Sequence, residues 1–188
     1  MEHFYENIYG WFSYEYLYQD AVSRAADGAL FVEIGSFKGR SSAYMCVEIA
    51  NSGKKIKFDC IDPMIVMSHY VESQQQHPEI WADYTAEDFH KKLESVKDYY
   101  TLHQMTSDEA VKLYEDGSID FLMIDGDHDP VAVERDVRNW LPKMKKGGVI
   151  AGDDAYLPEI FQAAVRGVQG TDSTAVLANG IHFWIEVV

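Results

Sequence analysis

Short apolar runs alternate with segments of helical periodicity along most of the chain. The runs have the length of single strands, and their continuous apolar character suits strands that are buried in a parallel sheet. They lie at residues 29–35, 56–62, 99–104, 119–125 and 147–154. The helical patterns between them lie at residues 41–51, 85–97, 107–115 and 130–144. This β–α–β alternation predicts an α/β protein with a Rossmann-like, doubly wound and mainly parallel sheet.

The helical pattern at 130–144 has clear end signals. Its apolar residues share one face, which is predicted to pack on the sheet: Val133, Val137, Trp140 and Leu141. Pro130 can open this helix at its first position, and the pair Gly147 and Gly148 is expected to close its exit.

The C-terminal part of the chain shows a helical pattern at 158–168 and two further strand patterns, "STAVLA" (173–178) and "IHFWIEVV" (181–188). The Asn-Gly pair between these strands is a hairpin signal, so the seven-stranded sheet is predicted to end in an antiparallel strand. A chain of 188 residues suits one domain. We expect residues 1–28 to form an N-terminal helical cap segment and residues 29–188 to form the sheet domain.

Composition and charge exclude several classes of partner. The formal net charge of −15 would repel a polyphosphate backbone and anionic lipid, so neither nucleic acid nor a membrane is expected as a partner. No segment approaches the ~20 apolar residues of a membrane helix, and a cytoplasmic location is expected. Cys46 and Cys60 fall on a predicted helix and a predicted strand, which favours buried thiols over a disulfide or a zinc site.

The first predicted strand ends in a glycine turn, "VEIGSFKGRSS". Gly35 and Gly39 let the backbone turn tightly and leave amides free to meet a carboxylate. Ser41 is expected to cap the following helix and to donate to the same carboxylate. The dinucleotide pattern G-x-G-x-x-G is absent. An ordinary tight turn explains the two glycines equally well.

Acidic residues follow the other strands. Asp62 ends the second strand, where an acid can accept hydrogen bonds from ribose hydroxyls, although a turn aspartate before Pro63 would look the same. Four more acids follow the fourth and fifth strands, which we expect to be neighbours: Asp125, Asp127, Asp153 and Asp154. Crowded carboxylates without cysteine favour magnesium or calcium. Alternatively, Asp127 and Asp129 cap the next helix, and the other pair begins a surface turn.

Taken together, these motifs resemble a known family. "EIGSFKGRS" is similar to the first motif of catechol O-methyltransferase, and "IDGDH" and "WLPKMKKGGVIAGDD" resemble small bacterial and phage methyltransferases and macrolide-sugar O-methyltransferases. The resemblance is to class I S-adenosyl-methionine-dependent methyltransferases, and more closely to the metal-dependent O-methyltransferases.

The resemblance implies roles for particular residues. Glu33 would brace the glycine turn, Asp62 would hold the ribose, and Ser107, or Thr106 if the alignment slips, would contact the adenine. The methionine end of the cofactor would be surrounded by Gly35, Phe37, Gly39 and Ser41. Asp125 is assigned to the cofactor site and, with Asp153 and Asp154, to a divalent cation, expected to be magnesium. His128 matches the general base of the sugar enzymes, with Asp127 orienting it or supporting the metal ligands.

The acceptor is the least defined part of this interpretation. A long interruption at 64–84 follows the second strand and is expected to act as a lid. Aromatic residues of the N-terminus would cover the same mouth, pack on the sheet or form a dimer contact. A hydroxyl of a sugar-like or phenolic small molecule is the expected acceptor. A dinucleotide-dependent oxidoreductase and a non-catalytic S-adenosyl-methionine-binding protein are the alternatives, and homo-oligomer formation stays open.

Overall fold

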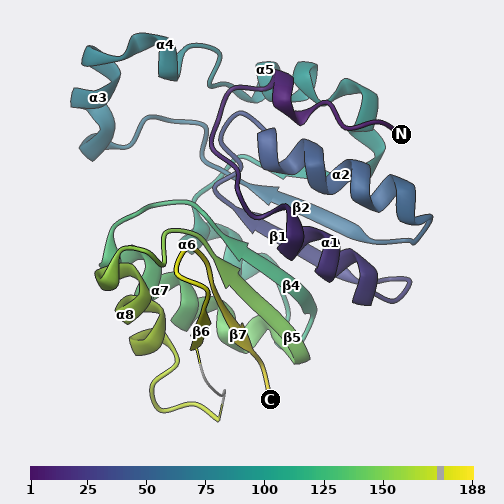
Figure 1. Ribbon diagram of the computed structural model, residues 1–188. Coiled ribbons are helices and arrows are strands. Elements are labelled where there is room, and N and C mark those ends of the chain that lie inside the picture. The colour runs from purple at the N-terminus through teal and green to yellow at the C-terminus, as the bar shows by residue number, and fades with distance from the viewer. Residues whose placement is uncertain (173–175) are drawn as a thin grey trace.

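The computed structural model describes residues 1–172 and 176–188, whose strands form one seven-stranded sheet in the order β3-β2-β1-β4-β5-β7-β6 (Figure 1). The strands are β1 Leu30–Ile34, β2 Lys57–Ile61, β3 Thr101–His103, β4 Ile119–Ile124, β5 Met144–Gly152, β6 Val176–Ala178 and β7 Phe183–Glu186. Strands β1 to β5 are parallel, and β7 runs antiparallel to both of its neighbours. The predicted Rossmann-like α/β sheet with an antiparallel C-terminal strand is confirmed.

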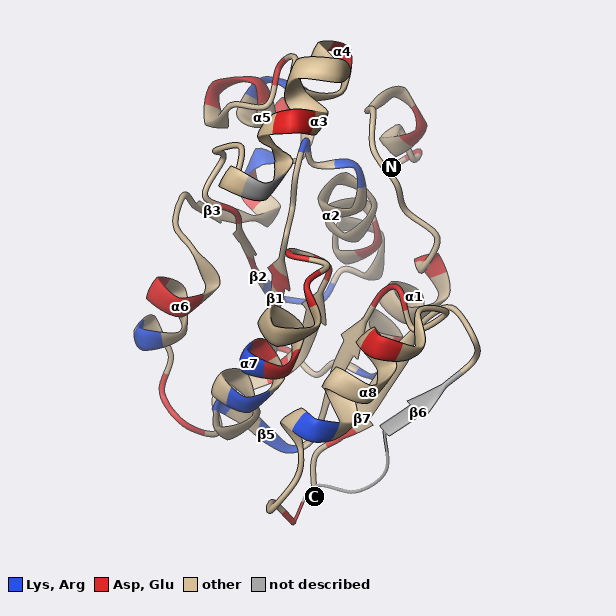
Figure 2. Cartoon of the chain, turned by 90° about the vertical axis from the view of Figure 1, so that its left-hand side faces the viewer, with Lys and Arg blue, Asp and Glu red and all other residues tan. Residues whose placement is uncertain are grey.

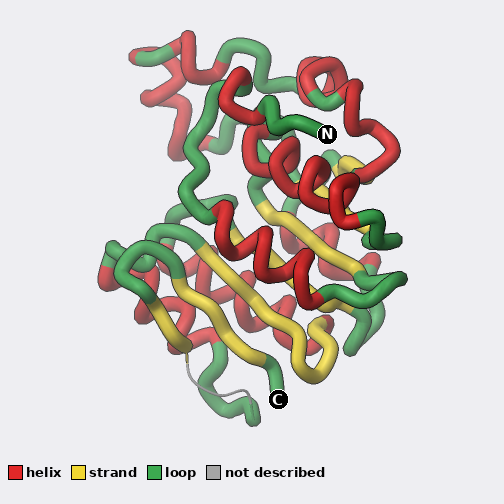
Figure 3. The backbone as a smooth tube through the Cα atoms, turned by 45° about the vertical axis from the view of Figure 1, so that its right-hand side comes forward, coloured by secondary structure: helices red, strands yellow, loops and turns green. Residues whose placement is uncertain are grey.

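Helices cover both faces of the sheet and enclose two apolar cores (Figures 1 and 3). One core lies under α1 Glu15–Arg24, α2 Arg40–Ser52 and α5 Ala86–Lys92. The other core lies under α7 Pro130–Trp140 and α8 Pro158–Gly167. Alternate strand residues feed the two cores, as Phe31 of β1 does for the first and Val32 for the second.

Short helical elements connect the larger ones. They are the α-helices α3 Val71–Gln76, α4 Pro78–Trp81 and α6 Ser107–Ala110 and the 3-10 turns η1 Tyr5–Asn7, η2 Ser68–Tyr70, η3 Glu94–Tyr99, η4 Val111–Leu113 and η5 Leu141–Lys143. The predicted helix at 85–97 is therefore α5 followed by η3, since α5 ends at Lys92 and Leu93 leaves the helical backbone region with φ of −97° and ψ of 14°. The predicted helix at 107–115 likewise reduces to α6 and η4.

Helix α7 follows its predicted start but ends before its predicted exit. Pro130 occupies the first turn, and the Asp129 carboxylate caps it by accepting hydrogen bonds from two backbone amides. The expectation that the helix reaches residue 144 and exits at Gly147 and Gly148 is wrong, because Met144 already begins β5. The pairing of β4 with β5 shifts register here. A Cβ on Gly148 would lie 2.9 Å from the Lys145 carbonyl oxygen, so this position of the irregular strand requires a residue without a side chain.

The predicted C-terminal hairpin is confirmed. The Asn179 side chain accepts hydrogen bonds from the amides of Ile181 and His182 at 3.0 and 2.9 Å, and Ala178 pairs with Phe183 across the turn. Residues 173–175 of the predicted strand 173–178 lie outside the described residues.

The prediction of buried thiols agrees with the structure. Cys46 and Cys60 are both fully buried, and burial raises the pKa of each thiol. Within residues 1–172 and 176–188, no helix combines the length and the apolar character needed to cross a membrane.

Candidate functional site

The sequence-predicted site residues after β1, β2, β4 and β5 lie along one edge of the sheet. Strand β1 pairs with both β2 and β4, and β4 pairs with β5, all in parallel, so their carboxyl ends come side by side. Figure 2 shows acidic residues in the loop that leads from this edge into α7. This is the edge at which open α/β sheets bind their ligands.

The glycine turn packs directly on the loop after β4. Gly35 has φ of +89°, and a Cβ at this position would lie 2.0 Å from the carbonyl oxygen of Asp125. Gly39 has φ of +90° and is itself the residue that precedes α2. The prediction that Ser41 caps α2 is therefore wrong, because Ser41 lies inside the first turn. Its side chain lies near the hydroxyl of Tyr14 instead.

Glu33 is fully buried in β1 and holds two helices. Its carboxylate accepts a hydrogen bond from the Tyr18 hydroxyl of α1 at 2.6 Å and another from the Ser42 hydroxyl of α2. Glu33 therefore ties the helix that follows the glycine turn to the strand that precedes it.

Asp62 lies beside the glycine turn and is only 4% exposed. One carboxylate oxygen, Oδ2, accepts from the amide of Phe37 at 2.8 Å. The other, Oδ1, accepts from the amide of Met64 at 2.8 Å and from the hydroxyl of Tyr84 at 2.6 Å. Burial raises the pKa of Asp62, and these donors oppose the rise. The side chain thus shapes the local turn, as one of the two interpretations expected, and it also contacts the glycine turn.

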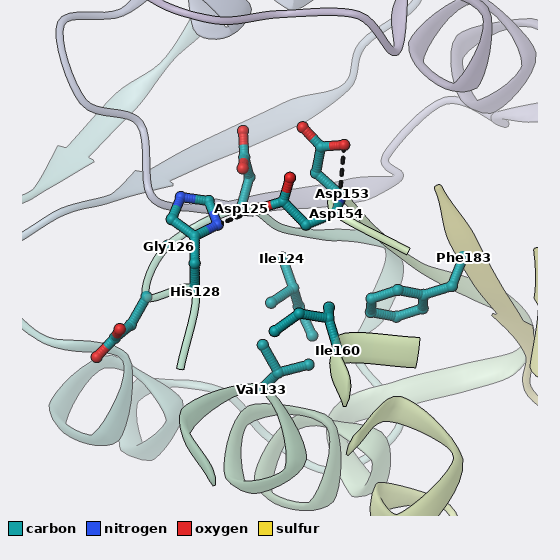
Figure 4. A pocket seen from close by; sticks show the side chains of 10 residues that line it. Ile124, Asp125, Gly126, His128, Val133, Asp153, Asp154, Ile160 and Phe183 are labelled. Carbon is teal, nitrogen blue, oxygen red and sulfur yellow. Dashed lines mark hydrogen bonds and ion pairs between the residues drawn. The ribbon is translucent and has the colours of Figure 1, made fainter. Parts of the chain in front are cut away.

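The acids after β4 and β5 come together with His128 in a small cavity that Phe183 and aliphatic side chains close from below (Figure 4). Asp125 accepts a hydrogen bond from the Tyr14 hydroxyl at 2.7 Å. The Nδ1 atom of His128 forms an ion pair with Asp154, and the buried His182 lies with Nε2 3.3 Å from an oxygen of Asp153.

Burial and the crowding of charged side chains shift the pKa values in this cavity. Burial and the charge of Asp153 raise the pKa of Asp125, and burial also raises that of Asp153. The hydrogen bond with Asp154 raises the pKa of His128 to about 9, so this histidine is mostly protonated at neutral pH. The same contact lowers the pKa of Asp154.

The three predicted metal ligands fit a hard cation in donor type but not in arrangement. Asp125, Asp153 and Asp154 offer the carboxylate oxygens that magnesium prefers. Yet no group of three or more His, Cys, Asp or Glu side chains is placed to hold a metal ion in the part of the chain that the structure describes. Each of the three acids is instead directed to a tyrosine or a histidine of the protein.

Ser107 is the first residue of α6, which follows β3, and its hydroxyl is already engaged. It donates to Asp136 at 2.7 Å and accepts from the Trp140 indole at 2.8 Å. Thr106 caps α6 in a reciprocal pair with Glu109. Burial raises the pKa of Asp136 to about 6. An adenine contact of Ser107 stays a prediction.

Four residues of this region were not predicted from the sequence to belong to the site: Tyr14, Tyr70, Tyr84 and His182. Tyr14 and Tyr84 donate to Asp125 and Asp62, and the hydroxyl of Tyr70 accepts from the backbone amide of His128. His182 also lies 3.1 Å from the hydroxyls of Ser13 and Tyr16. The sequence shows that aromatic residues surround these positions, but it does not indicate which group each of these side chains contacts.

A Rossmann-like sheet with a glycine turn and a buried acid at its carboxyl edge defines a class of enzymes that bind nucleoside-containing cofactors. Residues 32–155 match a family described as a methyltransferase domain, so the chain belongs to this family and is an S-adenosyl-methionine-dependent methyltransferase. This membership decides against the dinucleotide-dependent oxidoreductase that the sequence left open.

Solved structures share the fold at low sequence identity. The O-methyltransferase NovP has a TM-score of 0.69 at 13% identity over 93% of this chain and 79% of its own. A SAM-dependent O-methyltransferase from Thermotoga maritima has a TM-score of 0.60 at 9% identity, over 96% and 68%. Precorrin-6y C5,15-methyltransferase from Geobacter metallireducens has a TM-score of 0.61 at 14% identity, over 93% and 87%. No curated protein matches the sequence. Two of these names specify an O-methyltransferase and the third a C5,15-methyltransferase, so the fold alone does not choose an acceptor.

Proposed function

We propose that the chain methylates a hydroxyl of a small molecule, sugar-like or phenolic, with His128 as the general base. The observation that carries this proposal is the pairing of His128 with Asp154 at the carboxyl edge, beside Asp125 and next to the glycine turn. Two solved structures of the same fold bear the name O-methyltransferase, which supports the choice of oxygen as the acceptor atom.

The chemistry assigns separate tasks to the two nitrogens of His128. S-adenosyl-methionine supplies a methyl group on a positively charged sulfur, and the acceptor hydroxyl must lose its proton as its oxygen attacks. Asp154 holds Nδ1 and thereby orients the ring, which leaves Nε2 to take that proton. Asp154 also stabilises the imidazolium that results. The side chain of His128 is 47% exposed, so an acceptor can reach it from solvent.

The raised pKa of His128 sets a condition on this role. A protonated imidazole cannot accept a proton, so the base is active only in the fraction of molecules in which His128 is neutral. With a pKa of about 9, that fraction grows as pH rises through the neutral range. We therefore expect turnover to increase toward alkaline pH.

We assign the cofactor to the edge formed by β1, β2 and β4. The methionine end would lie against the turn formed by Gly35, Phe37 and Gly39, with Ser41 donating to its carboxylate. Asp62 would accept from the ribose, Ser107 would lie near the adenine, and Asp125 would border the methionine end. Glu33 would hold the turn in place from β1. The buried position of Asp62, beside the amide of Phe37, supports this assignment.

A divalent cation, magnesium in the first instance, is the second part of the proposal. Its ligands would be Asp125, Asp153 and Asp154, whose crowding supports the assignment because burial and mutual repulsion raise the pKa values of the first two. A bound cation would lower the pKa of the acceptor hydroxyl. Asp154 would bind the cation through Oδ1 and keep Oδ2 on His128, whereas the ion pair of Asp153 with His182 would have to yield to the cation.

Two segments would enclose the acceptor. We propose that residues 1–28 act as a cap over the domain formed by residues 29–188, since Tyr14 reaches Asp125 from this segment. The insertion at 64–84 would act as a lid, since Tyr70 from its first part contacts the amide of His128. A cytoplasmic location, homo-oligomer formation and the absence of nucleic acid and membrane partners stay predictions.

Calorimetric titration and a methyl-transfer assay test the proposal. S-adenosyl-homocysteine should bind the purified protein with micromolar affinity, and labelled methyl groups should pass from S-adenosyl-methionine to members of a panel of phenols and sugars. Both measurements are repeated with magnesium and with a chelator. Activity that is indifferent to the chelator would remove the metal from the proposal, and transfer only to nitrogen or carbon acceptors would overturn the hydroxyl.

A further inference from the structure

The carboxylate of Asp62 is nearly saturated by the protein itself. A carboxylate offers about four lone-pair positions to hydrogen-bond donors. The amide of Met64 and the hydroxyl of Tyr84 take two on Oδ1, and the amide of Phe37 takes one on Oδ2. About one position is therefore left for a ligand.

A ribose needs two such positions, because its 2′ and 3′ hydroxyls both donate when an acid binds the diol. One of the three existing bonds must then yield. The amides of Phe37 and Met64 belong to the backbone of the turns beside Asp62, and Gly35 packs the first of these turns on the loop after β4. Tyr84 is the only donor of the three that is a side chain, and it can move without altering the turns.

We propose that the hydroxyl of Tyr84 occupies part of the ribose site and is displaced from Asp62 when the cofactor binds. This inference rests on the proposed role of Asp62. Burial and the charge of Asp62 raise the pKa of Tyr84 above its usual range, so its hydroxyl keeps the proton that it donates at any ordinary pH. Tyr84 is thus a permanent competitor of the ribose.

Displacement of Tyr84 would be transmitted to the insertion at 64–84. The Tyr84 ring contacts the Phe37 ring at a centroid distance of 5.1 Å and the Trp81 ring at 5.7 Å. Trp81 in turn contacts Tyr70 at 5.5 Å, and Tyr70 bonds the amide of His128. Figure 1 shows α3 and α4 of this insertion set apart from the sheet. Cofactor binding is therefore coupled through three aromatic rings to the segment that contacts the loop of the proposed base.

Calorimetric titration of S-adenosyl-homocysteine into three proteins tests the inference. The Tyr84→Phe variant should bind about tenfold more tightly than the parent, because the competing hydroxyl is gone while the ring remains. Tyr114→Phe is the matched control. Its hydroxyl donates at 2.8 Å to Asp59 of β2, the strand that precedes Asp62, and this contact lies away from the proposed ribose site. Removal of the hydroxyl should leave the affinity unchanged.

A second ligand separates competition from a general loosening of the site. The 2′-deoxy form of S-adenosyl-homocysteine has one ribose hydroxyl and fits the position that Asp62 still offers, so the tenfold gain of Tyr84→Phe should disappear with it. An affinity of Tyr84→Phe for the full ligand that equals or falls below that of the parent overturns the inference, as does an equal gain for both ligands.

The variant Asp62→Ala separates a failure of the inference on Tyr84 from a failure of the ribose assignment. Loss of binding in Asp62→Ala together with an unchanged affinity in Tyr84→Phe would sink the inference on Tyr84 and leave the ribose assignment intact. Undiminished binding by Asp62→Ala would remove the ribose assignment and the inference together. Thermal unfolding of each variant checks that the fold is retained.

Discussion

The two halves of the carboxyl edge are built in different ways. Beside β1 and β2, glycines and backbone amides shape the site, and Asp62 accepts two of its three hydrogen bonds from the backbone. Beside β4 and β5, like-charged side chains crowd together, and residues from distant parts of the chain satisfy them. The backbone of the first half is therefore in place before a ligand arrives, and Tyr84 is the side-chain partner that a ligand would replace there, whereas the acids of the second half are held by side chains.

Replacement of His128 tests the second half and should have the largest effect. His128→Ala should lower kcat by about 100-fold to 10,000-fold, the usual contribution of a general base, and should leave cofactor affinity unchanged. In the parent, kcat should rise with pH as His128 loses its proton near pH 9, and the variant should lack this rise. His90→Ala, which alters an exposed histidine on α5, is the control. A variant as fast as the parent removes the base assignment.

Replacement of Gly35 tests the first half. A Cβ would lie 2.0 Å from a backbone oxygen, and the backbone is left-handed at φ of +89°, so Gly35→Ala should lower the free energy of unfolding by about 4 kcal/mol. The measurement is urea unfolding. Gly53→Ala is the control, because Gly53 ends α2 at φ of +67° with no atom within 4 Å of the added carbon. It should lose about 1 kcal/mol. Equal losses would contradict the close packing of the turn.

The same contrast explains what the sequence could predict. The glycine turn, the start of α7 at Pro130 and the alternation of strands and helices follow from local patterns, and the structure confirms them. Asp125, Asp153 and Asp154 converge because β4 and β5 are neighbours, which topology also predicts. The predicted helix exit at Gly147 and Gly148 is wrong, because glycines mark a helix exit and a strand irregularity alike.

The partners of the acids could not be predicted from spacing. Tyr14 and Asp125 are separated by 111 positions, and Ser13 and His182 by 169, so only the packing of the N-terminal segment against the loop after β4 and against the C-terminal hairpin brings these pairs together. The helix pattern at 85–97 looked continuous, and the sequence did not show that the α-helix ends at Lys92. Local signals determine elements, whereas the contacts among these residues depend on the assembled fold.

Replacement of Asp136 tests whether burial of a carboxylate charge beside α6 opposes folding. Its pKa rises from 3.8 to about 6 on folding, so the folded state binds the proton more tightly than the unfolded state. Its contribution to stability is therefore greatest below pH 4 and is lost as pH rises toward 6. The rise corresponds to about 3 kcal/mol. Asp136→Asn keeps an acceptor for Ser107 and removes the charge.

The measurement compares urea unfolding of Asp136→Asn and of the parent at several pH values. Relative to the parent, the variant should gain stability as pH rises from 4 to 6, and the gain should then stay constant. Other acids titrate in both proteins and cancel in the difference. A difference that does not change with pH would show that Asp136 has an ordinary pKa.

Tyr14 lies where the two halves meet, and its replacement tests whether its hydroxyl links them. The Ser41 side chain from the first half lies near its hydroxyl, which donates to Asp125 in the second. Tyr14→Phe should lower the free energy of unfolding by about 1.5 kcal/mol, because a partly buried carboxylate loses a donor. Tyr18→Phe is the matched control, since its hydroxyl donates to the buried Glu33 and should cause a similar loss. Only Tyr14→Phe should also lower kcat/KM, by about tenfold, because only its hydroxyl reaches the proposed catalytic acids. Equal losses of activity in the two variants would mean that this hydroxyl stabilises the fold without linking the halves.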